Sequence, residues 1–413
     1  MYPRSSVLLN YKEELNMNSN NQALLVTSLL SPATIKPNLS IAGKQAHRAA
    51  LIVLLFIISM MLTPWGVVHA GATTPVVTTP VKWHPGHYYS LMDHGKNASW
   101  YLSMVYKELK ATPALRGVHI RYSWAELETS EGVYNFSAIA KRLSEVSAID
   151  KRLIIMLELK SFDPLDEFVP DYIKTSAYEG GIFEYENHNS TPNSNGGKNI
   201  KLWNPLVRDR LVALIRALGN RFNSNPYFEG IGLTETSMAI PVVPLTSTQI
   251  NGYYDNIIEL QQQMRKHFPN TVTFQFTNYP RPILESFIGS LNAMGAGLGG
   301  PDTFLEEPGL LFPNNPKGVY NYYPQLSGIV PLAPSVMSGN YKNTRVDGTG
   351  YQPTVAELLT FARDTLKANY IFWMRNPDYS PKVLELLNMR NQKITPSGGL
   401  DPTCPSVYSS CIN

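Results

Sequence analysis

The sequence predicts a single (β/α)8 barrel, an α/β fold in which eight parallel strands alternate with helices. Two observations predict it: short apolar runs recur eight times between residues 83 and 395, and helical patterns fall between most of them. Strands that alternate with helices are typical of a parallel sheet, and eight such units over about 300 residues fit closure into a barrel. A doubly wound open sheet is the alternative, but it usually has a glycine-rich phosphate turn after the first strand, which is missing here.

The strand candidates are apolar runs of barrel-strand length. In chain order they are GHYYSLM, GVHIRYSW, RLIIMLELKSF, FEGIGLTET, TVTFQFTN, AMGAGL, GIVPLAP and NYIFWMR. The clearest helical stretches, 204–222 and 354–368, place apolar residues at three- and four-residue spacing, which is the period of an amphipathic helix.

The first 70 residues predict export. The most apolar stretch of the chain, 49–70, follows Lys44 and Arg48 and ends in a small-residue site. A basic flank, an apolar core and such a site are the layout of a signal peptide. An uncleaved membrane anchor is the alternative, because the run is nearly long enough to span a bilayer. We therefore expect a secreted or periplasmic protein, or one anchored to the membrane through 49–70 and facing outside the cytoplasm, with a Thr- and Pro-rich linker at 71–82.

Charge argues against a nucleic-acid partner. The chain has 35 basic and 32 acidic residues, and the first 70 residues hold five and two of these, so the remainder is balanced at 30 each. Nucleic-acid binding needs a basic patch, and no run of Lys and Arg is present. No phosphate loop, metal-ligand spacing or Ser-His-Asp pattern stands out either, so we expect no cofactor and no metal. The sequence leaves the oligomeric state open.

Both cysteines lie in the C-terminal tail, 396–413. Cys404 and Cys411 enclose a short loop, and in an oxidising compartment they are expected to form a disulfide. Two free thiols in a frayed tail are the alternative.

The candidate site lies where the strands end, because barrel chemistry takes place at the C-terminal ends of the strands. The residues at these ends are Asp93, Arg121, Glu158 with Lys160, Glu235, Asn278, Asp302 and Trp373. The seventh strand candidate offers no acid.

A resemblance to a known family begins at the second strand. The segment GVHIRYSWAELETSEGVYNF resembles the second strand of the clan A glycoside hydrolases and the loop after it, where an Arg, a Trp, an acidic residue, a Gly and an aromatic follow one another. Those places are filled here by Arg121, Trp124, Glu128, Gly132, Tyr134 and Phe136.

Two further segments extend the resemblance and imply a sugar-active enzyme. WNPLVRDRLVALIRALGNRFNSNPYFEGIGLTET resembles the third helix and fourth strand of the family, and ANYIFWMRN resembles its eighth strand. Glu235 takes the place of the acid/base Glu, with Thr234 where the family usually has Asn, and Trp373 takes the place of the Trp that floors the sugar site. The family's nucleophile Glu ends strand seven, where this chain has no acid, so the resemblance implies a divergent member.

Two carboxyls are the catalytic candidates. Glu235 follows an apolar strand and is the expected general acid, although it could instead be a structural carboxylate paired with Arg121. Asp302 lies in GLGGPDTF, where glycines let a ligand approach the backbone, and is the expected base for a water molecule. A turn or helix-cap role is the alternative for Asp302.

The remaining candidates are substrate contacts. Glu158 and Lys160 alternate in phase on one strand, so both can face the barrel interior, and an internal ion pair is the simpler explanation for them. Arg121 and Asn278 are candidate sugar contacts. Trp124 and Trp373 are candidate stacking platforms, since sugar rings pack their C–H faces on aromatic rings, although barrel aromatics more often belong to the core.

The resulting hypothesis is an exported glycoside hydrolase that cleaves a poly- or oligosaccharide. The alternatives are a barrel that binds sugar without cutting it, or that serves polysaccharide assembly, and a different class of barrel enzyme. Asp302 lies two strands from Glu235, and two strand steps of about 4.8 Å separate the backbones by about 10 Å. That gap fits a water between the carboxyls, so we expect inversion at the anomeric carbon.

Overall fold

The computed structural model describes residues 79–92, 98–186 and 196–413. The predicted export segment at 49–70, most of the predicted linker and the strand-end candidate Asp93 lie outside these ranges. Within them, no helix has the length and apolar character needed to span a bilayer.

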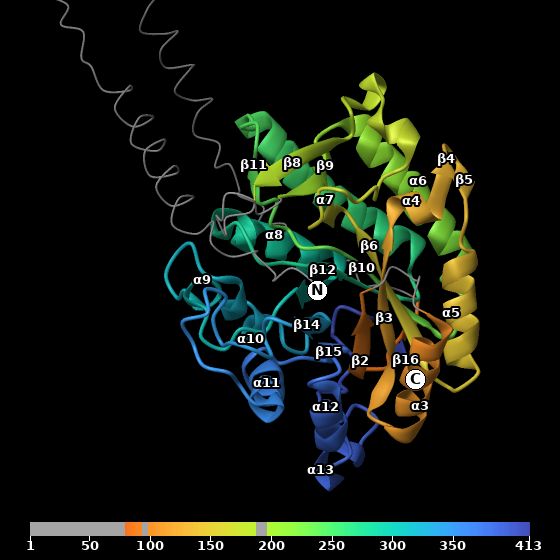
Figure 1. Ribbon diagram of the computed structural model, residues 1–413, viewed down its shortest axis with the longest axis vertical. Helices are drawn as coiled ribbons and strands as arrows, with labels where there is room; N and C mark the ends of the chain where they lie inside the picture. The colour runs from red at the N-terminus through yellow and green to blue at the C-terminus, as the bar shows by residue number, and fades with distance from the viewer. Residues whose placement is uncertain (1–78, 93–97, 187–195) are drawn as a thin grey trace, which may run out of the picture. The chain divides into compact units, whose positions relative to one another are not determined.

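Eight parallel strands form a closed barrel (Figure 1). They are β2 (Gly86–Leu91), β3 (Leu115–Ser123), β6 (Arg152–Glu158), β10 (Phe228–Leu233), β12 (Val272–Phe276), β13 (Gly297–Gly300), β14 (Leu332–Val336) and β15 (Tyr370–Met374). Each pairs with the next in chain order, and β15 pairs with β2 to close the ring. The predicted barrel is confirmed, each strand candidate overlaps one of these strands, and the open-sheet alternative is wrong.

Helices follow most of the strands. The α-helices are α3 (Ser99–Ala111), α4 (Trp124–Leu127), α5 (Ser137–Ser147), α6 (Pro205–Phe222), α7 (Ser247–His267), α8 (Arg281–Met294), α9 (Pro308–Leu311), α10 (Tyr323–Leu326), α11 (Val355–Thr360), α12 (Ser380–Leu387) and α13 (Arg390–Lys393). Helix α6 begins as its sequence predicts, because the Asn204 side chain accepts hydrogen bonds from the first turn and a proline occupies the first helical position. The predicted helix 354–368 is α-helical only to Thr360 and continues as a π turn, η4 (Phe361–Thr365).

Aromatic rings fill the barrel interior because β10 contains glycines that make room for them. A Cβ atom at Gly232 would lie 2.4 Å from the ring of Phe274. Phe274 and Phe276 pack there with Phe372, whose ring stacks on His119 at 4.4 Å. The interior is therefore a packed core, as expected for a barrel of eight strands.

A second, smaller sheet adjoins the barrel and contains residues of the candidate site. It comprises β7 (Lys160–Ser161), β8 (Ile182–Glu186), β9 (Gly197–Ile200) and β11 (Ile240–Pro241), in the order β11-β8-β9-β7. Figure 1 shows β8, β9 and β11 grouped apart from the barrel strands. The single strand predicted over 152–162 therefore divides, because the backbone leaves the barrel after Glu158 and pairs with β9 instead.

The C-terminal tail is folded against the barrel. Strand β16 (Cys411–Ile412) pairs in parallel with β1 (Val81–Lys82), and Cys404 and Cys411 form a disulfide. Tyr408 is buried beside Trp83. The predicted disulfide is confirmed, and the alternative of a frayed tail with free thiols is wrong.

A buried acid lies at the opposite end of the barrel from the candidate site. Glu229, at the start of β10, accepts hydrogen bonds from the backbone N–H and Nδ1 of His84, at 2.7 and 2.8 Å, and from the hydroxyl of Tyr370 at 2.7 Å. Burial opposes its charge, but these bonds lower the pKa of Glu229 to about 2. Because polar groups at this end of a barrel support stability, the cluster is structural.

Candidate active site

The structure brings six of the candidate side chains to the C-terminal end of the barrel. Arg121 lies on β3, Glu158 ends β6, Lys160 begins β7, and Glu235, Asn278 and Asp302 each lie two residues beyond β10, β12 and β13. All but Asp302 are buried. This grouping follows from parallel strands, whose carboxyl ends meet at one rim.

Glu235 forms a buried ion pair with Lys160. The Nζ of Lys160 lies 3.3 Å from Oε1 of Glu235, and both side chains are 2% exposed. The ammonium also donates to the backbone oxygen of Ser237 at 3.0 Å, and it lies over the rings of Phe162 and Tyr185. Burial lowers the pKa of Lys160, and the charge of Glu235 opposes that effect.

The small sheet holds Lys160 in this position. Lys160 pairs with Asn199 of β9, and the hydroxyl of Tyr185, from β8, donates to the backbone oxygen of Ser161 at 2.8 Å. Gly197 is required for this packing, because a Cβ atom there would lie 2.2 Å from the Tyr185 hydroxyl. The small sheet, which lies outside the barrel, thus determines the position of the Lys160 ammonium.

Arg121 and Glu158 form the second ion pair of the site. Their closest charged atoms are 3.7 Å apart on the neighbouring strands β3 and β6. The expected internal pair of Glu158 with Lys160 is wrong, and the alternative pairing of Glu235 with Arg121 is not formed either, because Glu235 pairs with Lys160. The reason is that Lys160 lies past the end of β6, where the backbone has turned toward β9.

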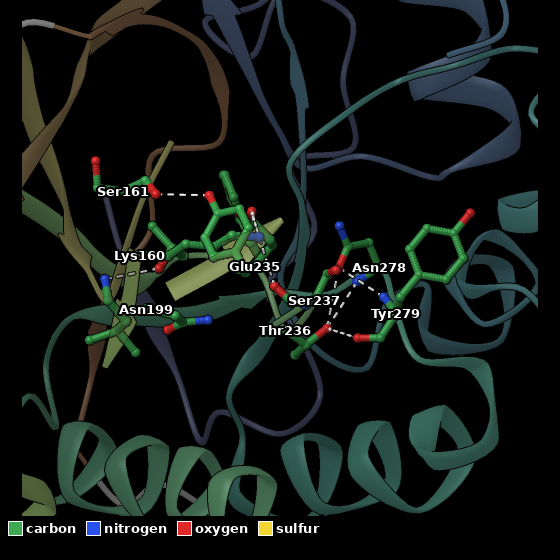
Figure 2. A network of polar contacts seen from close by, with 12 residues as sticks. Lys160, Ser161, Asn199, Glu235, Thr236, Ser237, Asn278 and Tyr279 are labelled. Atoms are coloured by element: carbon green, nitrogen blue, oxygen red, sulfur yellow. Dashed lines mark hydrogen bonds and ion pairs between the residues drawn. The ribbon is translucent and has the colours of Figure 1, made fainter. Parts of the chain in front are cut away.

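Asn278 ties the loops after β10 and β12 together (Figure 2). Its side-chain oxygen accepts from the backbone N–H groups of Ser237, at 3.1 Å, and Tyr279, at 2.8 Å. The hydroxyl of Thr236 accepts from the Asn278 N–H at 3.2 Å and donates to the backbone oxygen of Tyr279 at 2.7 Å. These bonds fix the segment that carries Glu235.

Asp302 is a partly buried carboxyl beside a small cavity. The amide of Asn340, from the loop after β14, donates to its Oδ1 at 3.3 Å. Burial and then the negative charge of Glu235 raise the pKa of Asp302 to about 7, against the opposing effects of the Asn340 hydrogen bond and the Arg121 charge. The cavity of about 10 Å³, lined also by Asn278 and Tyr320, has room for about one water molecule.

The two tryptophan candidates are packed in the interior. The Trp373 indole is fully buried and donates to Nδ1 of His87 at 3.0 Å. Trp124 is 2% exposed and donates to Glu128 at 2.7 Å. Glu128 also accepts a hydrogen bond from the N–H of Gly132 and pairs with Arg210. These contacts hold the loop after the second strand in place. The burial of Trp373 and Trp124 favours a packing role for both over sugar stacking.

Sequence reasoning missed four residues around the two carboxyls. Phe162 and Tyr185 flank Lys160, Ser237 provides its carbonyl oxygen, and Asn340 contacts Asp302. Asn340 follows the seventh strand, in the segment PSVMSGN. Because barrel sites lie at the C-terminal ends of the strands, this position could have been identified from the sequence. Only an acid was expected at that strand end, because the residue that the family places there is a Glu.

Comparison with known proteins supports the fold. No family model and no curated protein matches the chain. Matching solved structures include endo-glycoceramidase II from Rhodococcus sp., at 12% identity over 75% of this chain and 80% of that one, with a TM-score of 0.47. Another is the catalytic domain of beta-amylase from Paenibacillus polymyxa, at 10% identity over 78% and 96%, with a TM-score of 0.44. A third is beta-galactosidase from the psychrophilic Marinomonas ef1, at 8% identity over 77% and 61%, with a TM-score of 0.50.

The match to beta-galactosidase, with a TM-score of 0.50, supports the eight-stranded parallel barrel. The resemblance found in the sequence is therefore confirmed at the level of the fold. At such low identity the likeness concerns the fold alone, and activity has to be argued from the site.

Proposed function

We propose that this chain is a glycoside hydrolase of poly- or oligosaccharides, with Glu235 and Asp302 as its catalytic carboxyl pair. The observation that carries the proposal is the placement of two carboxyls at the barrel mouth, two residues beyond β10 and β13, where burial and then the charge of Glu235 raise the pKa of Asp302. Glycosidic hydrolysis needs one protonated and one ionised carboxyl, and a pair whose environments differ supplies both at neutral pH.

The surrounding side chains suit a sugar substrate. Arg121, Lys160 and Asn278 place charged and amide groups beside the carboxyls, and such groups hydrogen-bond to sugar hydroxyls. The cavity beside Asp302 accommodates about one water and not a sugar ring.

A glycan panel tests the proposal. Wild type is expected to release reducing sugar from at least one poly- or oligosaccharide. Glu235→Gln and Asp302→Asn are each expected to lower that rate by about 10²–10⁴-fold, the usual contribution of acid–base catalysis. Glu385→Gln and Asp255→Asn make the same chemical changes on exposed helix surfaces and serve as controls. Activity that survives loss of Glu235 would point to a different class of barrel enzyme.

A sugar-binding barrel without hydrolytic activity, such as an accessory protein of polysaccharide assembly, is the second candidate. The observation in its favour is β14, whose buried residues LAPSV contain no acid, with the amide of Asn340 in the loop that follows. Calorimetric binding of oligosaccharides without any product release would support this function over hydrolysis.

Export is part of the proposal. The segment 49–70 and its basic flank support it, and the Cys404–Cys411 disulfide is consistent with an oxidising compartment. The N-terminus of the exported protein is expected near Gly71. A soluble cytoplasmic pool that retains Met1 or Met17 would contradict this.

A further inference from the structure

We infer that Lys160 sets the roles within the carboxyl pair, so that Glu235 is the ionised partner and Asp302 is the proton donor. This reverses the roles expected from the sequence and the family resemblance. It rests on the proposed function, but its structural core is a statement about protonation that can be measured without turnover.

Every contact of the Lys160 ammonium favours a cation. A carboxylate oxygen of Glu235 lies at 3.3 Å, a backbone carbonyl oxygen of Ser237 at 3.0 Å, and the faces of two aromatic rings at 4.7 and 4.9 Å. Aromatic faces and carbonyl oxygens both carry partial negative charge toward the ion. A buried ammonium in this setting needs an ionised carboxylate beside it, because an unpaired buried charge is strongly unfavourable.

Asp302 has the opposite surroundings. Among the described residues its side chain takes part in no ion pair, and its Oδ1 receives one hydrogen bond from a neutral amide, Asn340. Burial and the charges of Glu235 and Glu307 disfavour its ionised form, whereas the Asn340 hydrogen bond and the charge of Arg121 favour it. Arg121 is engaged with Glu158, so the proton of the pair resides on Asp302.

These states define an inverting reaction. Asp302 gives its proton to the glycosidic oxygen as the bond from that oxygen to the anomeric carbon breaks, and the bonding electrons leave with the oxygen. Glu235 accepts a proton from a water molecule whose oxygen bonds to the same carbon from the other face. The Nζ of Lys160 lies 3.3 Å from Oε1 of Glu235 and so stabilises the ionised form of this base. The proton then returns from Glu235 to Asp302 through solvent.

Leaving-group dependence tests the roles. A 2,4-dinitrophenyl glycoside of the sugar that wild type cleaves departs without protonation. Asp302→Asn is therefore expected to keep within about tenfold of the wild-type rate on that substrate while losing about 10²–10⁴-fold on the natural glycan. Glu235→Gln is expected to lose activity on both the dinitrophenyl glycoside and the natural glycan. The reverse pattern, with Glu235→Gln retaining the activated substrate, would overturn the inference.

Carboxyl ¹³C NMR tests the protonation states directly in the free protein, with Asp302→Asn and Glu235→Gln identifying the two signals. Asp302 is expected to titrate near pH 7. In Lys160→Met the proton is expected to move to Glu235 and Asp302 to titrate at lower pH, whereas Lys160→Arg preserves the wild-type order. A protonated Glu235 beside an ionised Asp302 in wild type would refute the inference. A wild type that titrates as expected but cleaves no glycan would instead refute the proposed function.

Discussion

At the residue scale, Asp302 destabilises the folded protein by an amount that depends on pH. Its pKa in the folded protein is about 7, above the unfolded value of 3.8. Between these values the folded state binds the proton more tightly than the unfolded chain, so the contribution of Asp302 to stability falls as pH rises from about 4 to about 7. Such a cost at neutral pH is a common compromise at active sites, which agrees with the role proposed for Asp302.

Asp302→Asn is therefore expected to be more stable than wild type at pH 7.5. Since asparagine does not titrate, the difference in free energy of unfolding between variant and wild type should grow from pH 4 to pH 7 and then level off. Urea unfolding at several pH values measures it, with Asp255→Asn as the exposed control. A difference that stays constant across this range would show that Asp302 has an ordinary pKa.

At the element scale, the glycines of β10 leave space for the ring of Phe274. A Cβ atom at Gly232 would lie 2.4 Å from that ring, so Gly232→Ala is expected to lower the free energy of unfolding by about 1–3 kcal/mol. Gly289, within α8, has open space around it, and Gly289→Ala is expected to raise stability by about 0.5–1 kcal/mol. Urea midpoints that shift in the same direction for both variants would contradict this account.

The barrel strands were predictable because their signal is local. Each is a short apolar run bounded by polar or turn residues, and FEGIGL and YIFWM keep their predicted places. Pairing of the charges was not predictable, because it depends on β7 leaving the barrel to join β9. Periodicity along 152–162 cannot show that departure. The burial of Trp373 likewise depends on His87, which is 286 residues away in the chain.

At the scale of the whole molecule, the C-terminal tail contributes through packing more than through its disulfide. The Cys404–Cys411 bond closes a short loop, and its entropic contribution grows with loop length, so replacing both cysteines by serine is expected to cost about 2 kcal/mol. Tyr408 is buried under Arg265 and beside Trp83, and Tyr408→Ala is expected to cost about 3–5 kcal/mol, as for other large aromatic truncations. Equilibrium unfolding of the two variants compares them, and a larger loss from the serine variant would reverse the ranking.

Glu235 and Asp302 are proposed to act together across the barrel mouth, and product stereochemistry tests this pairing most directly. Their strands, β10 and β13, are separated by β12. Two strand steps put the backbones about 10 Å apart, which leaves space for a water between the side chains. Proton NMR of the first-formed sugar, recorded before mutarotation, is predicted to show the anomer opposite to that of the substrate bond. A first product that keeps the substrate's anomeric configuration would contradict this pairing and require a nucleophile at another strand end.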